Sequence, residues 1–144
     1  ATGHVSYDPE NHHKMVELRQ QKVDIIANDI PKCKIYGKGQ GDLLVVGWGG
    51  THGAIRSAVE SAQSEGLSIS HLHLRHLNPL PKDLGEILVK FQKVMIPELN
   101  LGQLAMIIRS KFLVDVISLC KVQGKPFTQT EVYHKIAELI KDMK

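Results

Sequence analysis

The residues best suited to chemistry follow a short apolar run near the middle of the chain. Segment 43–46 is apolar, and segment 47–53 contains four glycines together with Trp48, Thr51 and His52. Glycines permit a sharp turn and a close approach of backbone to ligand, and the free amides at a helix start favour an anion. The pattern predicts strand, turn and helix, with Thr51 capping the helix. His52 is then an exposed first-turn residue, either an anion contact or acid/base group or simply solvated.

The glycines also approach a dinucleotide-binding fingerprint. Gly47, Gly49 and Gly53 give G-x-G-x-x-x-G, but His52 occupies the third glycine position of the stricter motif. No acidic residue ends the next predicted strand, where Arg75 stands and could suit a 2′-phosphate. We interpret the turn as structural. The alternative is a free-standing nucleotide- or dinucleotide-binding α/β protein that uses the Gly47–Gly53 turn.

Histidines and cysteines are the candidates for metal ligands. His71 and His73 alternate on a predicted strand and share one side, whereas His76 falls beyond it. Cys33 and Cys120 are far apart, with no zinc-like spacing and no cluster motif. We expect no metal site and no iron–sulfur cluster in this chain, and we expect both cysteines to be reduced.

A second polar group follows another predicted strand. Asn100 and Gln103 have the spacing of a capping box, in which each side chain bonds a free amide of the helix start. Capping does not explain Glu98, which we place in the loop beyond the strand. Its carboxylate either holds a neighbouring subunit or ligand, or is solvated. No nucleophile is paired with a base, so no catalytic residue is expected.

The surrounding pattern alternates strands with amphipathic helices. Strands are predicted at 34–36, 43–46, 69–74, 94–96 and 114–119. The helices between and after them have apolar residues three and four positions apart, in the sets Ile55, Ala58, Val59, Ala62; Leu84, Ile87, Leu88, Phe91; Leu101, Leu104, Ala105, Ile108; and Val132, Ile136, Leu139, Ile140. The last helix follows a capping box at Thr128 and Glu131. This order predicts an α/β fold with a five-stranded, mainly parallel sheet between helices, and ligands at the carboxyl ends of its strands.

The N-terminal segment has a different character. Asp8 and Pro9 predict the start of a helix that continues to about Asn28, before Pro31, with a weak apolar face. We interpret residues 1–31 as a helical connector arm that packs on another domain, and residues 32–144 as the α/β domain. The chain begins at Ala1, as expected of a piece of a longer polypeptide.

Composition narrows the classes of function. The 144 residues suit one core, the net charge is +3 without a basic run, and the longest apolar runs are too short to cross a bilayer. We therefore expect a cytoplasmic protein that binds neither nucleic acid nor membrane.

Three segments together resemble one enzyme family. They are LLVVGWGGTHGAIRSAVE, HLHLRHLNPLPKDLGEIL and PELNLGQLAMIIRSKFLVDVISLCKVQGKPF, of which the third is the most specific. The chain resembles the C-terminal part of the alpha subunit of 2-oxoglutarate (2-oxoacid):ferredoxin oxidoreductase. The resemblance implies a three-layer α/β/α domain like the C-terminal domain of transketolase, with an antiparallel edge strand that suits Lys34–Tyr36.

The resemblance also implies a function that belongs to a complex. Such enzymes oxidatively decarboxylate a 2-oxoacid, form acyl-coenzyme A and reduce ferredoxin, using thiamine diphosphate and an iron–sulfur cluster. The equivalent domain mainly packs against the remainder of the alpha subunit and the beta subunit, so the isolated chain should be inactive. Carried onto this sequence, the candidates for an interface or for an anionic group of coenzyme A are Gly49, Gly50, Thr51, His52, Arg75, Glu98, Asn100 and Gln103.

Overall fold

The computed structural model describes residues 3–143, which divide into two units. One unit comprises the residues up to Lys32 together with His76–Lys82, and the other comprises Cys33–Arg75 together with the residues from Asp83 onward. The first unit contains helix α1 (Pro9–Ile26), which Asp8 caps by accepting the Glu10 amide. No residue of α1 is buried, in keeping with the weak apolar face of its sequence. Its role as a connector stays a prediction.

The second unit is built on a five-stranded sheet. The strands are β1 (Ile35–Tyr36), β2 (Gly41–Trp48), β3 (Ile69–Leu74), β4 (Phe91–Glu98) and β5 (Val116–Cys120). They lie in the order β1-β3-β2-β4-β5. The edge strand β1 runs antiparallel to β3, and the other neighbours are parallel. The expected mainly parallel sheet with an antiparallel edge strand is confirmed.

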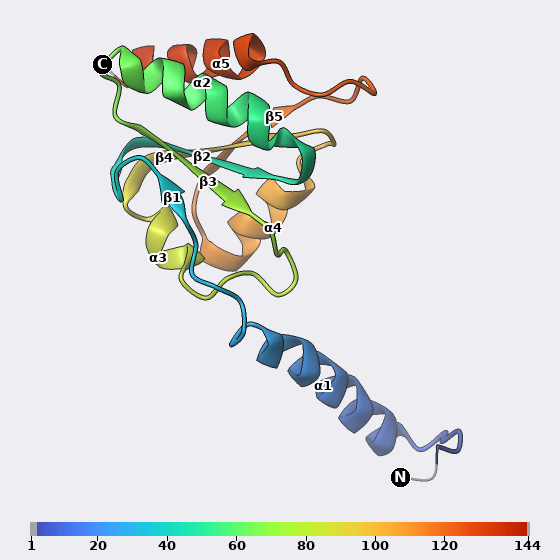
Figure 1. Ribbon diagram of the computed structural model, residues 1–144. Helices are drawn as coiled ribbons and strands as arrows, with labels where there is room; N and C mark the ends of the chain where they lie inside the picture. Colours follow the sequence, from blue (N-terminus) through green and yellow to red (C-terminus); the bar gives the residue numbers. More distant parts are fainter. Residues whose placement is uncertain (1–2, 144) are drawn as a thin grey trace. The chain divides into compact units, whose positions relative to one another are not determined.

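Helices cover both faces of this sheet (Figure 1). Helices α2 (His52–Ser64) and α5 (Gln129–Lys141) lie together on one face, and α3 (Leu84–Leu88) and α4 (Gln103–Phe112) lie on the other. Leu43 and Val45 of β2 pack against the apolar faces of α2 and α5 in one buried cluster. Burial of these side chains is the main source of stability, at roughly 25 cal/mol per Å² of apolar surface. The three-layer α/β/α fold is thereby confirmed.

Two expected helices differ from the structure. Helix α3 ends at Leu88, and Phe91 begins β4 instead of continuing the helical face. Helix α4 begins at Gln103, so Leu101 is 82% exposed in the preceding loop. Both errors have one cause. Phe91 and Leu101 have the spacing of a helical face, but Phe91 lies after the end of α3 and Leu101 lies before the start of α4. Strand β4 is also longer than the predicted 94–96, and Pro97 lies inside it.

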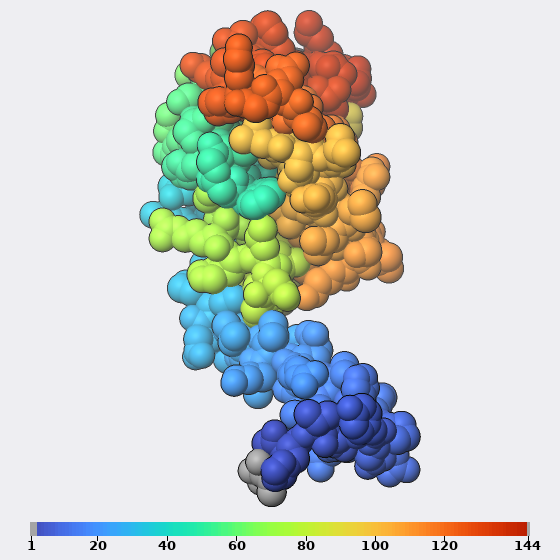
Figure 2. Space-filling view, turned by 90° about the vertical axis from the view of Figure 1, so that its right-hand side faces the viewer, coloured from blue at the N-terminus to red at the C-terminus, as the bar shows by residue number. Residues whose placement is uncertain are grey.

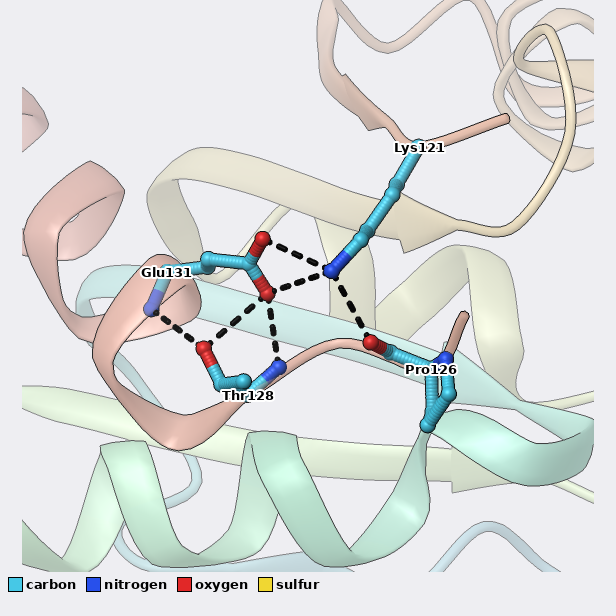
Figure 3. A network of polar contacts seen from close by, with 4 residues as sticks. All are labelled: Lys121, Pro126, Thr128 and Glu131. Atoms are coloured by element: carbon cyan, nitrogen blue, oxygen red, sulfur yellow. Dashed lines mark hydrogen bonds and ion pairs between the residues drawn. The ribbon is translucent and has the colours of Figure 1, made fainter. Parts of the chain in front are cut away.

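The start of α5 agrees with its predicted capping box. The Thr128 hydroxyl accepts the Glu131 amide, and the Glu131 carboxylate accepts the Thr128 amide at 2.7 Å (Figure 3). Lys121, which follows β5, donates to both Glu131 oxygens at 2.7 and 2.8 Å and to the Pro126 carbonyl at 2.9 Å. These hydrogen bonds lower the pKa of Glu131 to about 2, the bond from Lys121 most strongly. The network ties the loop after β5 to the last helix.

Candidate functional site

The glycine-rich segment forms a tight connection between β2 and α2. Gly49–Thr51 makes a short 3-10 turn, and α2 begins at His52, as the pattern predicts. Thr51 is buried, but its hydroxyl accepts the Trp48 amide at 3.2 Å and donates to the Trp48 carbonyl at 2.8 Å. Thr51 occupies the N-cap position without capping α2 through its side chain. The prediction of a capping hydroxyl is therefore wrong: Thr51 closes the turn instead.

Gly47 is required by packing. A Cβ atom at this position would lie 2.6 Å from Ile55 Cδ1 and 3.1 Å from both His73 Nδ1 and Thr51 Oγ1. Gly49 has a φ of +57°, a conformation that glycine adopts without strain. These two requirements of the fold account for the first half of the fingerprint, which supports our interpretation of a structural turn. A Cβ at Gly50 or Gly53 would meet only open space.

Glu98 is the most constrained polar residue in this region. It ends β4 with no exposed surface, and its carboxylate accepts the amides of Leu104 at 2.9 Å and Ala105 at 3.0 Å. It also accepts Trp48 Nε1 at 3.3 Å and Asn100 Nδ2 at 3.2 Å. The expectation that capping does not explain Glu98 is wrong, because its carboxylate caps the first turn of α4 from the end of the strand. Its placement in a loop beyond the strand is also wrong.

Asn100 supports the same turn from outside the helix. Its Oδ1 accepts the amides of Gly102 at 2.8 Å and Gln103 at 3.0 Å. The residue at the N-cap position is Gly102, with a φ of +88°. Asn100 thus bonds the start of the helix, but the predicted capping box is wrong, because the N-cap is Gly102 and Gln103 is the first helical residue instead of the third. Gln103 is exposed at the first helical position.

Glu98 joins this turn to the glycine-rich turn. Figure 2 shows the blue-green atoms of the turn after β2 beside the orange-yellow atoms of the segment before α4. The carboxyl ends of the parallel strands β2 and β4 thus form one edge, as expected of such sheets. Gly49, Gly50, Thr51, His52, Glu98, Asn100 and Gln103 belong to it, with Glu98 and Thr51 buried and His52 and Gln103 exposed.

A cluster of rings lies beside this edge, between the sheet and the start of α2. The ring centroids of His52 and His71 are 5.4 Å apart, those of His52 and His73 are 4.8 Å apart, and those of His71 and His73 are 5.9 Å apart. Tyr36 of β1 stacks on His71 at 5.6 Å, and the Arg56 guanidinium lies 4.3 Å from the Tyr36 centroid. We call these five residues the imidazole cluster. Sequence alternation predicted the shared face of His71 and His73, but no local signal placed Tyr36 and Arg56 with them.

The cluster keeps its inner histidines neutral. His71 has no exposed surface, and burial, reinforced by the nearby His52, His73 and Arg56, lowers its pKa to about 3. Burial also lowers the pKa of His73, together with His52 and Arg75, against an opposite effect of the Gly49 backbone. Neither ring nitrogen of His71, nor Nδ1 of His73, has a hydrogen-bond partner in the described part of the chain.

The remaining candidates do not form a metal or thiol site. Within residues 3–143, no three histidine, cysteine or acidic side chains converge as metal ligands. Arg75 follows β3 and is exposed, and His76 lies beyond the strand as predicted. Cys33 and Cys120 are both free thiols. Burial, with Asp83 nearby, raises the pKa of Cys33 to about 12, and burial with Glu98 nearby raises that of Cys120, so neither thiol is activated as a nucleophile.

Comparison with protein families identifies the domain. The model of the pyruvate:ferredoxin oxidoreductase core domain II matches residues 41–132, from the first residue of β2 into α5. The chain belongs to this family. Its α/β unit is thus a core domain II, and the glycine-rich turn and the Glu98 turn both lie within the matched region.

Curated relatives of this core domain II are subunits of oxidoreductases. The chain is 46% identical to the 2-oxoglutarate oxidoreductase subunit KorA of Mycobacterium tuberculosis, over 91% of the chain and 20% of that subunit. It is 32% identical to the alpha subunit of 2-oxoacid:ferredoxin oxidoreductase 1 of Aeropyrum pernix, over 97% of the chain and 23% of that subunit. The chain thus spans about a fifth to a quarter of the length of these relatives.

Solved structures agree with the fold. The 2-oxoglutarate:ferredoxin oxidoreductase from Magnetococcus marinus, with 2-oxoglutarate, coenzyme A and succinyl-CoA bound, matches with a TM-score of 0.88 and 30% identity, over 96% of this chain and 25% of that one. An inactive split-gene transketolase tetramer matches with a TM-score of 0.60 and 16% identity, over 76% of this chain and 41% of that one. The second likeness concerns the fold alone and agrees with the expected transketolase-like architecture.

Proposed function

We propose that the chain is a non-catalytic assembly domain of the alpha subunit of a 2-oxoglutarate:ferredoxin oxidoreductase. The observation that carries this proposal is the 46% identity to a 2-oxoglutarate oxidoreductase subunit over 91% of the chain. In this proposal the assembled, cytoplasmic complex decarboxylates 2-oxoglutarate oxidatively, forms succinyl-CoA and reduces ferredoxin. Glu98, Thr51 and Asn100 all bond to backbone of their own fold, which supports a structural rather than a catalytic role.

The proposed partners are the remainder of the alpha subunit and the beta subunit, with ferredoxin reached through the complex. Exposed apolar side chains on and before α4 offer a contact surface: Leu101 is 82% exposed, Met106 67% and Ile107 47%. Gln103, Met106 and Ile107 share one side of α4 because they are three and four residues apart. We call Leu101, Gln103, Met106 and Ile107 the assembly surface. Its position beside Asn100 continues the carboxyl edge of the sheet.

The chain's own residues do not fit two of the cofactors of the proposed complex. An iron–sulfur cluster needs several thiolates, and the chain has only Cys33 and Cys120. The described residues also offer no converging set of ligands for the metal ion that accompanies a diphosphate. We therefore place thiamine diphosphate and the iron–sulfur cluster on other parts of the complex.

Coenzyme A is the cofactor that exposed groups of this domain can contact. His52 and Arg75 are exposed, and a Cβ atom at Gly49 or Gly50 would meet only open space. A guanidinium and the backbone amides of a helix start both suit a phosphate. Titration calorimetry of coenzyme A with the assembled enzyme tests this assignment. We expect weaker binding by H52A and R75A; unchanged affinity in both variants contradicts it.

Activity measurements test the proposed function itself. The isolated chain should show no reduction of ferredoxin or of a viologen dye with 2-oxoglutarate and coenzyme A. The chain produced with the rest of its subunit and with the beta subunit should catalyse that reduction. Turnover of 2-oxoglutarate by the isolated chain overturns the proposal. A shift of Trp48 fluorescence with NAD, NADP or ATP would instead favour the nucleotide-binding alternative.

A further inference from the structure

The imidazole cluster has an arrangement that the proposed assembly role does not require. Three histidines from two elements meet with a tyrosine and an arginine, and His71 is fully buried although neither of its ring nitrogens is bonded within the described residues. A buried polar group without a hydrogen-bond partner costs stability. An apolar side chain at this position would avoid that cost, so the imidazole itself calls for an explanation.

The ionisable groups that lower the pKa of His71 are His52, His73 and Arg56, all of them bases. From α2 it faces His52 and Arg56, the latter paired with Glu60 at 2.5 Å on the outer side. From its own strand it faces His73, behind which lies Arg75. From β1 it faces the Tyr36 ring, with the Lys34 ammonium 5.3 Å from that ring's centroid. None of the groups that shift the pKa of His71 or His73 is a carboxylate. A proton on His71 would therefore meet only repulsion from these groups, and a proton on His73 would be favoured by the Gly49 backbone alone.

The cluster contacts two small structural elements. Tyr36, which stacks on His71, belongs to the two-residue edge strand β1, which pairs with β3. His73 lies opposite Gly47 in the register of β2 and β3. A Cβ atom added at Gly47 would be only 3.1 Å from His73 Nδ1. The histidine rings thus contact β1 through Tyr36 and lie beside the glycine-rich turn at Gly47.

We propose that the imidazole cluster is a pH-sensitive latch, which holds β1 and the glycine-rich turn closed at neutral pH and releases them when His71 and His73 are protonated. Closed packing requires neutral rings, because an imidazolium at the buried His71 and a second one at the half-buried His73 would lie beside each other and beside Arg56. Release needs only the separation of a two-residue strand and a turn, so it precedes unfolding of the sheet. The latch is a property of this chain and does not depend on assembly.

Hydrogen exchange and fluorescence of the 144-residue chain between pH 7.5 and 3 test the latch, a range that reaches the lowered pKa of His71. As the pH falls, we expect faster exchange of the Tyr36 amide, corrected for its intrinsic pH dependence, and stronger acrylamide quenching of Trp48, the only tryptophan. Far-UV circular dichroism should stay constant over the same range. Constant protection of Tyr36 and constant quenching down to pH 3 overturn the proposal.

Two variants test whether the pH dependence of opening comes from the imidazole cluster. H71F keeps a ring beneath Tyr36 but cannot be protonated, so its opening midpoint should fall by about one pH unit or more. H134F, which replaces an exposed histidine of α5, should keep the original midpoint. An unchanged midpoint in H71F overturns the latch, since the transition would then belong to a group outside the imidazole cluster.

If H71F does not fold, a measurement on the original chain still tests the latch. Long-range nitrogen–proton spectra report protonation of each imidazole directly. Proton uptake by His71 and His73 should coincide with the loss of Tyr36 protection. Uptake at a pH clearly different from that of the opening contradicts the latch.

Discussion

The indole of Trp48 donates its Nε1–H to Oε1 of Glu98 across 3.3 Å, so the end of β2 is bonded to the carboxylate that caps α4. Two connections that follow adjacent parallel strands are thereby fixed to each other through one buried side chain. This bond gives the carboxyl edge of the sheet a defined shape. A preformed edge suits a domain whose proposed role is to present a surface to other parts of a complex.

Replacing the Glu98 carboxylate should destabilise this edge. In E98Q one oxygen becomes an NH₂ group that faces an amide donor of α4, so the free energy of unfolding should fall by about 1–3 kcal/mol. Urea unfolding followed by Trp48 fluorescence measures the change. E86Q, at an exposed glutamate of α3, is the matched control and should have little effect. Equal stability of E98Q and the original chain would contradict the capping role.

Gly47 should tolerate no side chain. The Cβ of G47A would lie 2.6 Å from Ile55 Cδ1 in a filled space, and such overpacking costs about 1–3 kcal/mol. G53A is the contrasting variant, because its Cβ meets open space in α2 and alanine favours a helix by about 0.5–1 kcal/mol over glycine. In thermal unfolding, the melting temperature should be lower for G47A and higher for G53A than for the original chain. A stable G47A would show that packing does not require the glycine.

The ion pair of Lys121 and Glu131 should make stability depend on acid pH. The pKa of Glu131 is lowered to about 2 in the folded state, so its contribution is present above its ordinary pKa of about 4.5 and is lost as the pH falls towards 2. E131Q should therefore unfold at a lower temperature than the original chain at pH 6. The difference should shrink progressively below pH 4.5. E86Q, at an exposed glutamate of α3, is the matched control and should unfold at nearly the same temperature as the original chain at pH 6. A difference for E131Q that is independent of pH would contradict the ion pair.

The assembly surface should matter to the complex and not to the fold. M106E and I107E place a charge on exposed positions of α4, so the melting temperature of the chain should change little. Recovery of the alpha and beta subunits as one complex in size-exclusion chromatography should fall by several-fold. V89E changes a similarly exposed apolar residue after α3 and should leave recovery unchanged. Full recovery with both α4 variants would exclude this surface from the interface.

Much of the fold follows from patterns that are local in the sequence. Alternation in β3, the helical spacing in α2 and α5 and the capping box at Thr128 each depend on neighbouring residues, and the structure has all of them. The errors arise where the decisive contact is distant in sequence. Phe91 fits a helical face, yet its segment pairs with Gly41 in the sheet.

The candidate site shows the same limit more strongly. Glu98 was identified by residue type, but its partners in Trp48 and in α4 come from different elements, so its capping role could not be predicted from spacing. The imidazole cluster combines β1, α2 and β3. Of its residues, only His71 and His73 can be grouped from the sequence, because they alternate along one predicted strand and so share a face.

The most direct test of the assembly role is to remove this domain from the intact enzyme. The alpha subunit would be produced with the beta subunit, with and without the residues from Cys33 onward, and the complex assayed for 2-oxoglutarate- and coenzyme A-dependent reduction of ferredoxin. We predict that the shortened subunit forms no stable complex and shows no activity, and that the longer one shows both. An assembled and fully active complex without the domain would contradict the proposal.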